Sequence, residues 1–174
     1  MNAWRVGNMR RTGLSLVEMM AATTIMATLM VSVVVLVRSG YGVWNAYEED
    51  VNINENAYGV LRHVVRQLRQ ADSITVISPS SDTTGNLSFL TASVVTKSWS
   101  LDGAQQVWFN DGTSNYLLAN SIDQLIFVGY EADGVTATTV VSDIHLVKCT
   151  VQVTLPHGAG VTQTVSCKAW IRSW

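Results

Sequence analysis

The chain has 174 residues, of which 48% are hydrophobic and only 14% are charged, and its net charge is −2. This length has room for one globular domain and an extension. The charge is unevenly spread, because residues 1–38 sum to +3 and the remainder sums to −5. An acidic main part without a basic stripe argues against nucleic-acid binding.

The excess of hydrophobic residues lies in one segment near the N-terminus. Residues 14–37 contain a single ionisable side chain, Glu18, and about 20 apolar residues suffice for a helix to cross the hydrocarbon core of a bilayer. Three arginines precede this segment and an acidic remainder follows it. By the positive-inside rule, we expect a single-pass protein whose N-terminus stays in the cytoplasm and whose C-terminal part is translocated.

Glu18 separates the interpretations of this segment. A secretory signal peptide has an apolar stretch of roughly 7–15 residues before a small-residue cleavage site, and this stretch is longer. Arg10-Arg11 fits a twin-arginine signal, although such pairs also suit any positive-inside leader. A plain signal-anchor helix explains the length and the charge bias. It does not explain a carboxylate, which costs about 2.5–3.5 kcal/mol at the centre of a membrane helix.

The stretch from Arg10 to Met20, Arg-Arg-Thr-Gly-Leu-Ser-Leu-Val-Glu-Met-Met, resembles the N-terminal signal of type IV pilins and type II secretion pseudopilins. The resemblance implies that a prepilin peptidase removes residues 1–13 by cutting between Gly13 and Leu14, and that Leu14 is then N-methylated. Glu18 becomes the fifth residue of the mature chain, as in the family. Leu14 departs from the family pattern, in which this position is most often Phe.

Elementary electrostatics gives Glu18 a role in this setting. Cleavage creates an ammonium group on Leu14 in apolar surroundings, and a carboxylate on a neighbouring subunit can pair with it. Two unpaired charges in a medium of low dielectric constant are costly, and a matched pair is much less so. We therefore expect Glu18 to form an assembly salt bridge that rewards the correct register between subunits.

The helical pattern continues beyond the membrane segment. From Trp44 onward, apolar residues recur at intervals of three and four, which predicts an amphipathic helix. Three arginines line its opposite side: Arg62, Arg66 and Arg69. The full helix is expected over residues 14–71. Gly40 and Gly42 weaken it by roughly 1 kcal/mol each, so one bent helix and two helices with a hinge both remain open.

Residues 72–174 are predicted to form a β-rich domain. Strands are expected at 73–77, 86–92, 94–101, 106–110, 116–118 and 124–130, bounded by Asp-Gly turn dipeptides at 102–103, 111–112 and 133–134. Many short strands of this kind favour an antiparallel sheet. The fold class is therefore α+β, with a long N-terminal transmembrane helix packed on a C-terminal antiparallel β-sheet domain, and the resemblance to pilins implies that this fold is pilin-like.

The last forty residues predict a β-hairpin turning at residues 156–160. Pairing that is symmetric about Gly158 places Cys149 opposite Cys167, and it puts the alternating apolar residues of both strands on one face. In an oxidising compartment this arrangement favours a Cys149–Cys167 disulfide. Directly opposed residues come close enough mainly at non-hydrogen-bonded pairs. The alternative is a pair of buried free thiols.

No catalytic, cofactor or metal site is predicted. The three histidines, His63, His145 and His157, lie in no ligand spacing, and no nucleophile elbow, P-loop or dinucleotide fingerprint occurs. We therefore expect a structural subunit and not an enzyme.

The layout after the helix also resembles J-type minor pseudopilins, together with the related W-type minor pilins and F-type competence pseudopilins. The resemblance rests on three stretches: residues 61–71, residues 116–130 and the terminal hairpin. It implies a subunit of the bacterial inner membrane with a periplasmic domain, which helps to initiate or cap a pseudopilus for type II secretion. Its partners would be other major and minor pseudopilins, the prepilin peptidase, the inner-membrane assembly platform and membrane lipid.

Two alternatives to the secretion role stay open. A type IV pilus or a DNA-uptake system could use the same kind of subunit. A periplasmic binding domain held by a plain signal-anchor would explain the span without assembly.

Overall fold

The computed structural model describes residues 15–157 and 160–171. The leader and the cleavage site, including Gly13 and Leu14, lie outside the described residues. The chain divides into two compact units, residues 1–45 and 46–174.

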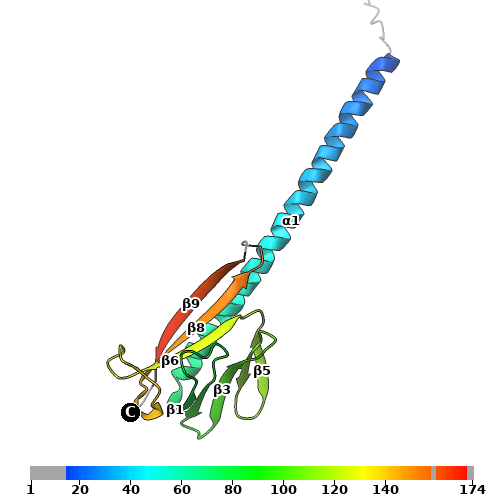
Figure 1. Ribbon diagram of the computed structural model, residues 1–174. Coiled ribbons are helices and arrows are strands. Elements are labelled where there is room, and N and C mark those ends of the chain that lie inside the picture. The colour runs from blue at the N-terminus through cyan, green and yellow to red at the C-terminus, as the bar shows by residue number, and fades with distance from the viewer. Residues whose placement is uncertain (1–14, 158–159, 172–174) are drawn as a thin grey trace, which may run out of the picture. The chain divides into compact units, whose positions relative to one another are not determined.

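One helix, α1, runs from Leu16 to Leu68 and belongs to both units (Figure 1). The helix continues without interruption through Gly40 and Gly42, so the structure has one helix here and not two. The predicted helix over residues 14–71 is confirmed in type, and its C-terminal end lies three residues earlier than expected. The helix stops just before the β-branched run that begins the sheet domain, whose residues favour strands.

The part of α1 that belongs to the second unit is amphipathic. Its buried residues recur at intervals of three and four, as one helical face requires: Ile53, Ala57, Val60, Leu61, Val64, Gln67 and Leu68. The three arginines of the opposite face are exposed, as predicted. This half of the helix is held by tertiary packing, because the buried face joins the core of the second unit.

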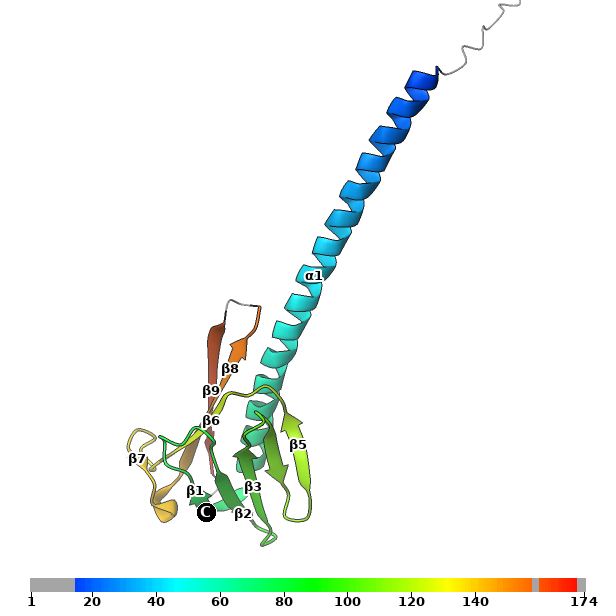
Figure 2. The ribbon, with the colours of Figure 1, turned by 45° about the vertical axis from the view of Figure 1, so that its right-hand side comes forward.

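The first sheet has five antiparallel strands in sequence order, β1-β2-β3-β4-β5. Its strands are β1 (Ala71–Ile77), β2 (Leu87–Thr91), β3 (Thr96–Leu101), β4 (Val107–Asn110) and β5 (Asn115–Ala119). Figure 2 shows this meander of neighbouring hairpins. Two register shifts interrupt the pairing of β1 with β2, so β1 is an irregular edge strand.

The second sheet has four antiparallel strands in the order β7-β6-β8-β9. Its strands are β6 (Gln124–Tyr130), β7 (Ala137–Thr138), β8 (Leu146–Leu155) and β9 (Val161–Trp170), and a 3₁₀ turn, η1 (Val141–Asp143), precedes β8. Long strands β8 and β9 form the terminal hairpin (Figure 1). An isolated parallel bridge between Thr84 and Leu125 joins the connection between β1 and β2 to β6.

The structure confirms the α+β class and every predicted strand, with ends shifted by a few residues. It differs from the single expected sheet by dividing the strands between two sheets. The two-residue strand β7 and the turn η1 were not predicted, since neither carries a periodic apolar pattern.

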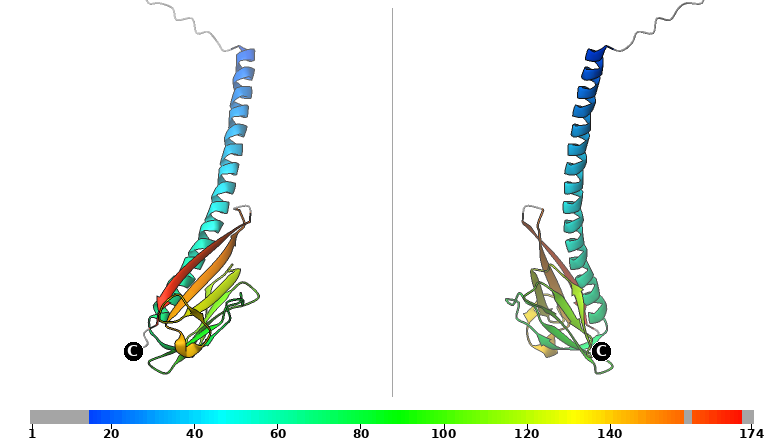
Figure 3. Two further views of the ribbon diagram at one scale, coloured as in Figure 1. Left: turned by 60° about the vertical axis from the view of Figure 1, so that its left-hand side comes forward. Right: turned by 90° about the vertical axis from the view of Figure 1, so that its right-hand side faces the viewer.

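The core of the second unit lies between α1 and the inner faces of the sheets (Figure 3). Its largest fully buried side chains include Trp99, Phe89 and Phe127. The Trp99 ring stacks on Phe89 at a centroid distance of 4.9 Å, and its indole Nε1–H donates to His63 Nδ1 at 3.2 Å. Helix and sheet are thus joined by a partly buried polar contact beside an aromatic cluster.

Candidate functional site

The first unit presents an apolar helix that its own chain does not cover. Residues 16–44 of α1 are all exposed, with large apolar side chains such as Leu16 and Leu36 about 77% and 69% accessible. The helix is long and apolar enough to cross a membrane. An exposed apolar surface of this extent indicates a membrane or a protein partner.

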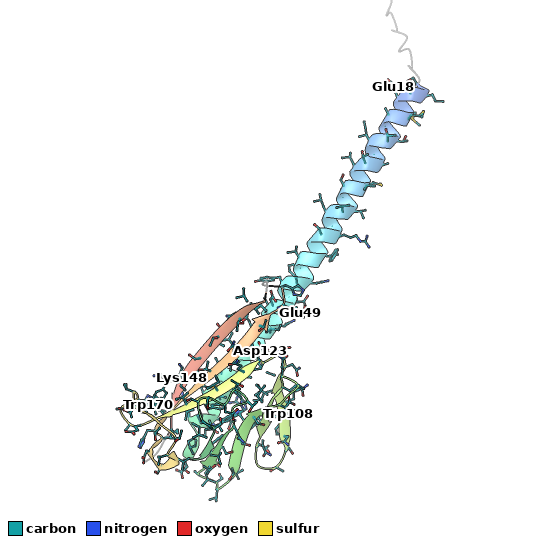
Figure 4. The ribbon with its side chains drawn as sticks, in the orientation of Figure 1. Glu18, Glu49, Trp108, Asp123, Lys148 and Trp170 are labelled. Carbon is teal, nitrogen blue, oxygen red and sulfur yellow. The ribbon has the colours of Figure 1, made fainter. Side chains whose placement is uncertain are left out.

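The start of this helix is closed by a reciprocal capping box. Ser15 N–H donates to Glu18 Oε2 at 2.9 Å, and Glu18 N–H donates to Ser15 Oγ at 3.2 Å. Glu18, labelled in Figure 4, is therefore the third residue of the helix and Ser15 its N-cap. The carboxylate also lies at the positive end of the helix dipole, where a negative charge is favoured.

The pattern Ser-x-x-Glu before an apolar run is the sequence signature of a capping box, and it was not among the predicted features. Ser15 is thus the site residue that was missed. The Glu18 carboxylate accepts a hydrogen bond from Ser15 N–H of its own chain. This bond partly offsets the free-energy cost of a carboxylate in a membrane helix. Its second oxygen, Oε1, accepts no hydrogen bond from the described residues, so it is free to meet a cation.

The hydroxyl groups of the apolar segment are satisfied within the helix. The five serine and threonine hydroxyls of residues 16–44 donate to backbone carbonyl groups three or four residues earlier: Thr23, Thr24, Thr28, Ser32 and Ser39. In a lipid environment, unpaired polar groups cost several kcal/mol each. Each serine and threonine hydroxyl of residues 16–44 therefore has a partner within the helix.

The terminal hairpin brings the two cysteines together as predicted. Cys149 is paired directly with Cys167, Val151 with Val165, and the register is uninterrupted from Leu146 to Leu155. Both cysteines are free thiols in the structure. A hydrogen bond from the Cys149 thiol to the Cys167 sulfur raises the pKa of Cys149, and burial raises it further. The same hydrogen bond lowers the pKa of Cys167.

Formation of the disulfide depends on whether Cys149 and Cys167 are a hydrogen-bonded or a non-hydrogen-bonded pair of the hairpin. Ile171 N–H donates to His145 O, and this pair extends the register of β8 and β9. Hydrogen-bonded pairs therefore fall on odd residue numbers, which include Cys149 and Cys167. At such pairs the Cβ atoms lie about 5.5 Å apart, whereas a disulfide needs about 3.8 Å. The disulfide stays a prediction, and its formation requires the strands to approach each other locally.

The aspartates at the turns stabilise the turn backbone. Asp102, Asp111 and Asp133 each accept two or more hydrogen bonds from backbone N–H groups of the following residues, as Asx turns do. In each case hydrogen bonds lower the pKa of the carboxyl group. Within residues 15–157 and 160–171, no three His, Cys, Asp or Glu side chains gather in a way that could hold a metal ion.

Comparison with protein-family models, with curated proteins and with solved structures finds no match. The residues that bear on function are therefore those described above: the capped start of α1 with Glu18, the apolar segment that follows, and the surface of the second unit.

Proposed function

We propose that this chain is a membrane-anchored, prepilin-type assembly subunit, most similar to the J-type minor pseudopilins. In this proposal a prepilin peptidase of the bacterial inner membrane cuts between Gly13 and Leu14, and Leu14 is methylated. The domain after the helix lies in the periplasm. There it helps to initiate or cap a pseudopilus together with other pseudopilins on the inner-membrane assembly platform.

The observation that carries the proposal is the position of Glu18. It is the only ionisable residue between positions 14 and 37 and lies four residues after the proposed new N-terminus. The capping box holds the carboxylate at the start of α1 through one oxygen, Oε2. The other oxygen can then pair with the Leu14 ammonium group of a neighbouring subunit, which would lower the cost of both charges in the apolar medium.

A second candidate function is a periplasmic binding domain on a plain signal-anchor, and the capping box favours it. Ser15 and Glu18 satisfy each other's backbone N–H groups, which is a sufficient structural reason for a glutamate at this place. In this case Glu18 serves the helix alone, residues 1–13 stay attached, and the chain does not assemble.

Two substitutions separate these functions. Glu18→Gln keeps the capping box, because glutamine accepts the same hydrogen bond, but it removes the charge. Ser15→Ala removes the N-cap, at a cost of about 1 kcal/mol, but it keeps the charge. For an assembly subunit, Glu18→Gln should abolish incorporation into filaments while membrane insertion is unchanged, and Ser15→Ala should have a small effect.

The measurements are mass spectrometry of the membrane-extracted chain and the amount of the chain in sheared filaments. The proposal predicts a mature chain that begins at N-methylated Leu14. An intact leader, or equal incorporation of Glu18→Gln and the wild type, would refute it and would favour the signal-anchor.

A further inference from the structure

The second unit exposes one long sheet edge. The second sheet ends at β9, which has ten residues and pairs only with β8 among the described strands. Because its odd residues are hydrogen-bonded to β8, the N–H and C=O groups of its even residues point away from the sheet. In the part of the chain that the structure describes, no backbone group accepts or donates to these outward groups.

The other edges are blunted in the ways that normally prevent strand addition. β1 carries two register shifts, β7 has two residues, and the pairing of the five-residue β5 with β4 is interrupted by a register shift. β9 is longer, regular and free of proline, and its even side chains from Thr162 to Trp170 are exposed. An exposed edge of this kind is a template for pairing with another chain.

A groove of about 730 Å³ lies between this edge and helix α1 of the same unit. Tyr58, Leu61 and Val65 supply its apolar side on the helix, and Ser166 and Cys167 supply the β9 side. An added strand would therefore rest one face on apolar side chains while its backbone pairs with β9.

The same groove is strongly cationic. Three arginines one turn apart line it, Arg62, Arg66 and Arg69. The residues lining the described groove include no acidic side chain, and the guanidinium groups of the three arginines make no hydrogen bond or ion pair with another described residue. Their charge is thus uncompensated, although the part of the chain after residue 38 is acidic, with a net charge of −5.

From the free edge and the unpaired arginines we infer that β9 accepts an extended acidic segment of a partner chain by strand addition. Its backbone pairs with the outward groups of β9. The side-chain face that it turns to the helix carries carboxylates, whose methylene groups contact the apolar residues of the groove and whose oxygens pair with the arginines. Arginine forms bidentate hydrogen bonds with carboxylates, which adds geometric selectivity. This inference goes beyond the proposed function. The groove belongs to the second unit, so binding there does not depend on whether the chain assembles into a filament.

The test measures binding of a fluorescein-labelled decapeptide of alternating valine and glutamate to the full chain in lipid nanodiscs, by fluorescence anisotropy. Saturable binding is expected, weakened at least tenfold when lysine replaces glutamate in the peptide. Methylation of every peptide amide should abolish binding, because it removes the backbone donors. These peptide comparisons use the wild-type protein, so they do not depend on how a variant folds.

Two matched variants test the site. Arg66→Ala should weaken binding at least threefold, whereas Lys148→Ala, which removes one cation from β8 (Figure 4), should change it less than twofold. Circular dichroism verifies the fold of both. Equal binding of the methylated peptide, or equal effects of the two variants, would overturn the inference. Self-association of the wild-type chain that Arg66→Ala abolishes would overturn it in favour of a second copy.

Discussion

The partly buried contact between His63 and Trp99 should make stability depend on pH. Trp99 is fully buried, and its Nε1–H donates to His63 Nδ1 at 3.2 Å. His63 can accept this bond only while it is neutral, because both nitrogens of a protonated imidazole are donors. Burial lowers the pKa of His63, and the charges of Arg66 and Lys97 lower it further.

The direction of the pH effect follows from proton linkage. The unfolded chain binds a proton at His63 below about pH 6.5, the usual value for histidine, and the folded chain does so only at lower pH. The stabilising effect of neutral His63 is therefore complete above this pH, and it is lost as the pH falls toward the folded-state pKa. Since one proton is involved, the slope contributed by His63 is at most about 1.4 kcal/mol per pH unit.

The substitutions His63→Gln and His63→Leu separate the hydrogen bond from the titration. Glutamine retains an acceptor but does not titrate, so the pH slope should decrease. Leucine leaves the indole N–H of Trp99 buried without a partner, which costs about 1–3 kcal/mol. At pH 8 we expect His63→Leu to be less stable than His63→Gln by about this amount, because both lose the ring contact with Phe109.

The assay is urea unfolding of the full chain in micelles, followed by circular dichroism at several pH values from 5 to 8. In a double-mutant cycle with Trp99→Phe, the cost of His63→Leu should shrink, because no donor is left unpaired. An unchanged pH slope in His63→Gln would show that other groups cause the acid sensitivity, and the reasoning about His63 would be wrong.

Two further predictions concern the second sheet. Gly129→Ala should lower the free energy of unfolding by about 1–3 kcal/mol, because a Cβ there would lie 2.8 Å from Ile144 side-chain carbons and 2.9 Å from a backbone oxygen. Gly103→Ala is the control in the same unfolding assay, because a Cβ there meets nothing within 4 Å. Equal effects of the two substitutions would contradict the packing argument. In the exported protein we expect Cys149 and Cys167 to be disulfide-bonded and to be reduced more readily than a relaxed bridge. Alkylation of the denatured, unreduced chain checks this, and two labelled cysteines would contradict it.

The terminal hairpin shows what local pattern can determine. Alternation of apolar residues fixed which face is buried, and the turn at residues 156–160 fixed the register, so the pairing of Cys149 with Cys167 was predicted and is confirmed. The hydrogen-bonding parity of that pair was not predicted. It depends on backbone geometry that alternating side chains do not encode, since both parities give the same buried face.

The division into two sheets depends on contacts between distant residues. β6 pairs with β8 across the intervening β7 and η1, and nothing in the local sequence of β6 distinguishes this partner from β5. The contact between His63 and Trp99 is of the same kind, because 36 residues separate the two side chains. Periodicity placed His63 on the helix, but its partner follows only from how the helix packs on the sheets.

Glu18 is the opposite case, in which a local signal was present and a different interpretation masked it. The spacing from Ser15 to Glu18 predicts a capping box, and the spacing from Gly13 to Glu18 predicts an assembly salt bridge. The two roles need not compete, because the cap occupies Oε2 and an ammonium group can approach Oε1. A carboxylate already fixed by its own helix loses less conformational entropy on pairing. The cap would therefore strengthen the subunit contact, and Ser15→Ala should weaken assembly slightly where Glu18→Gln abolishes it.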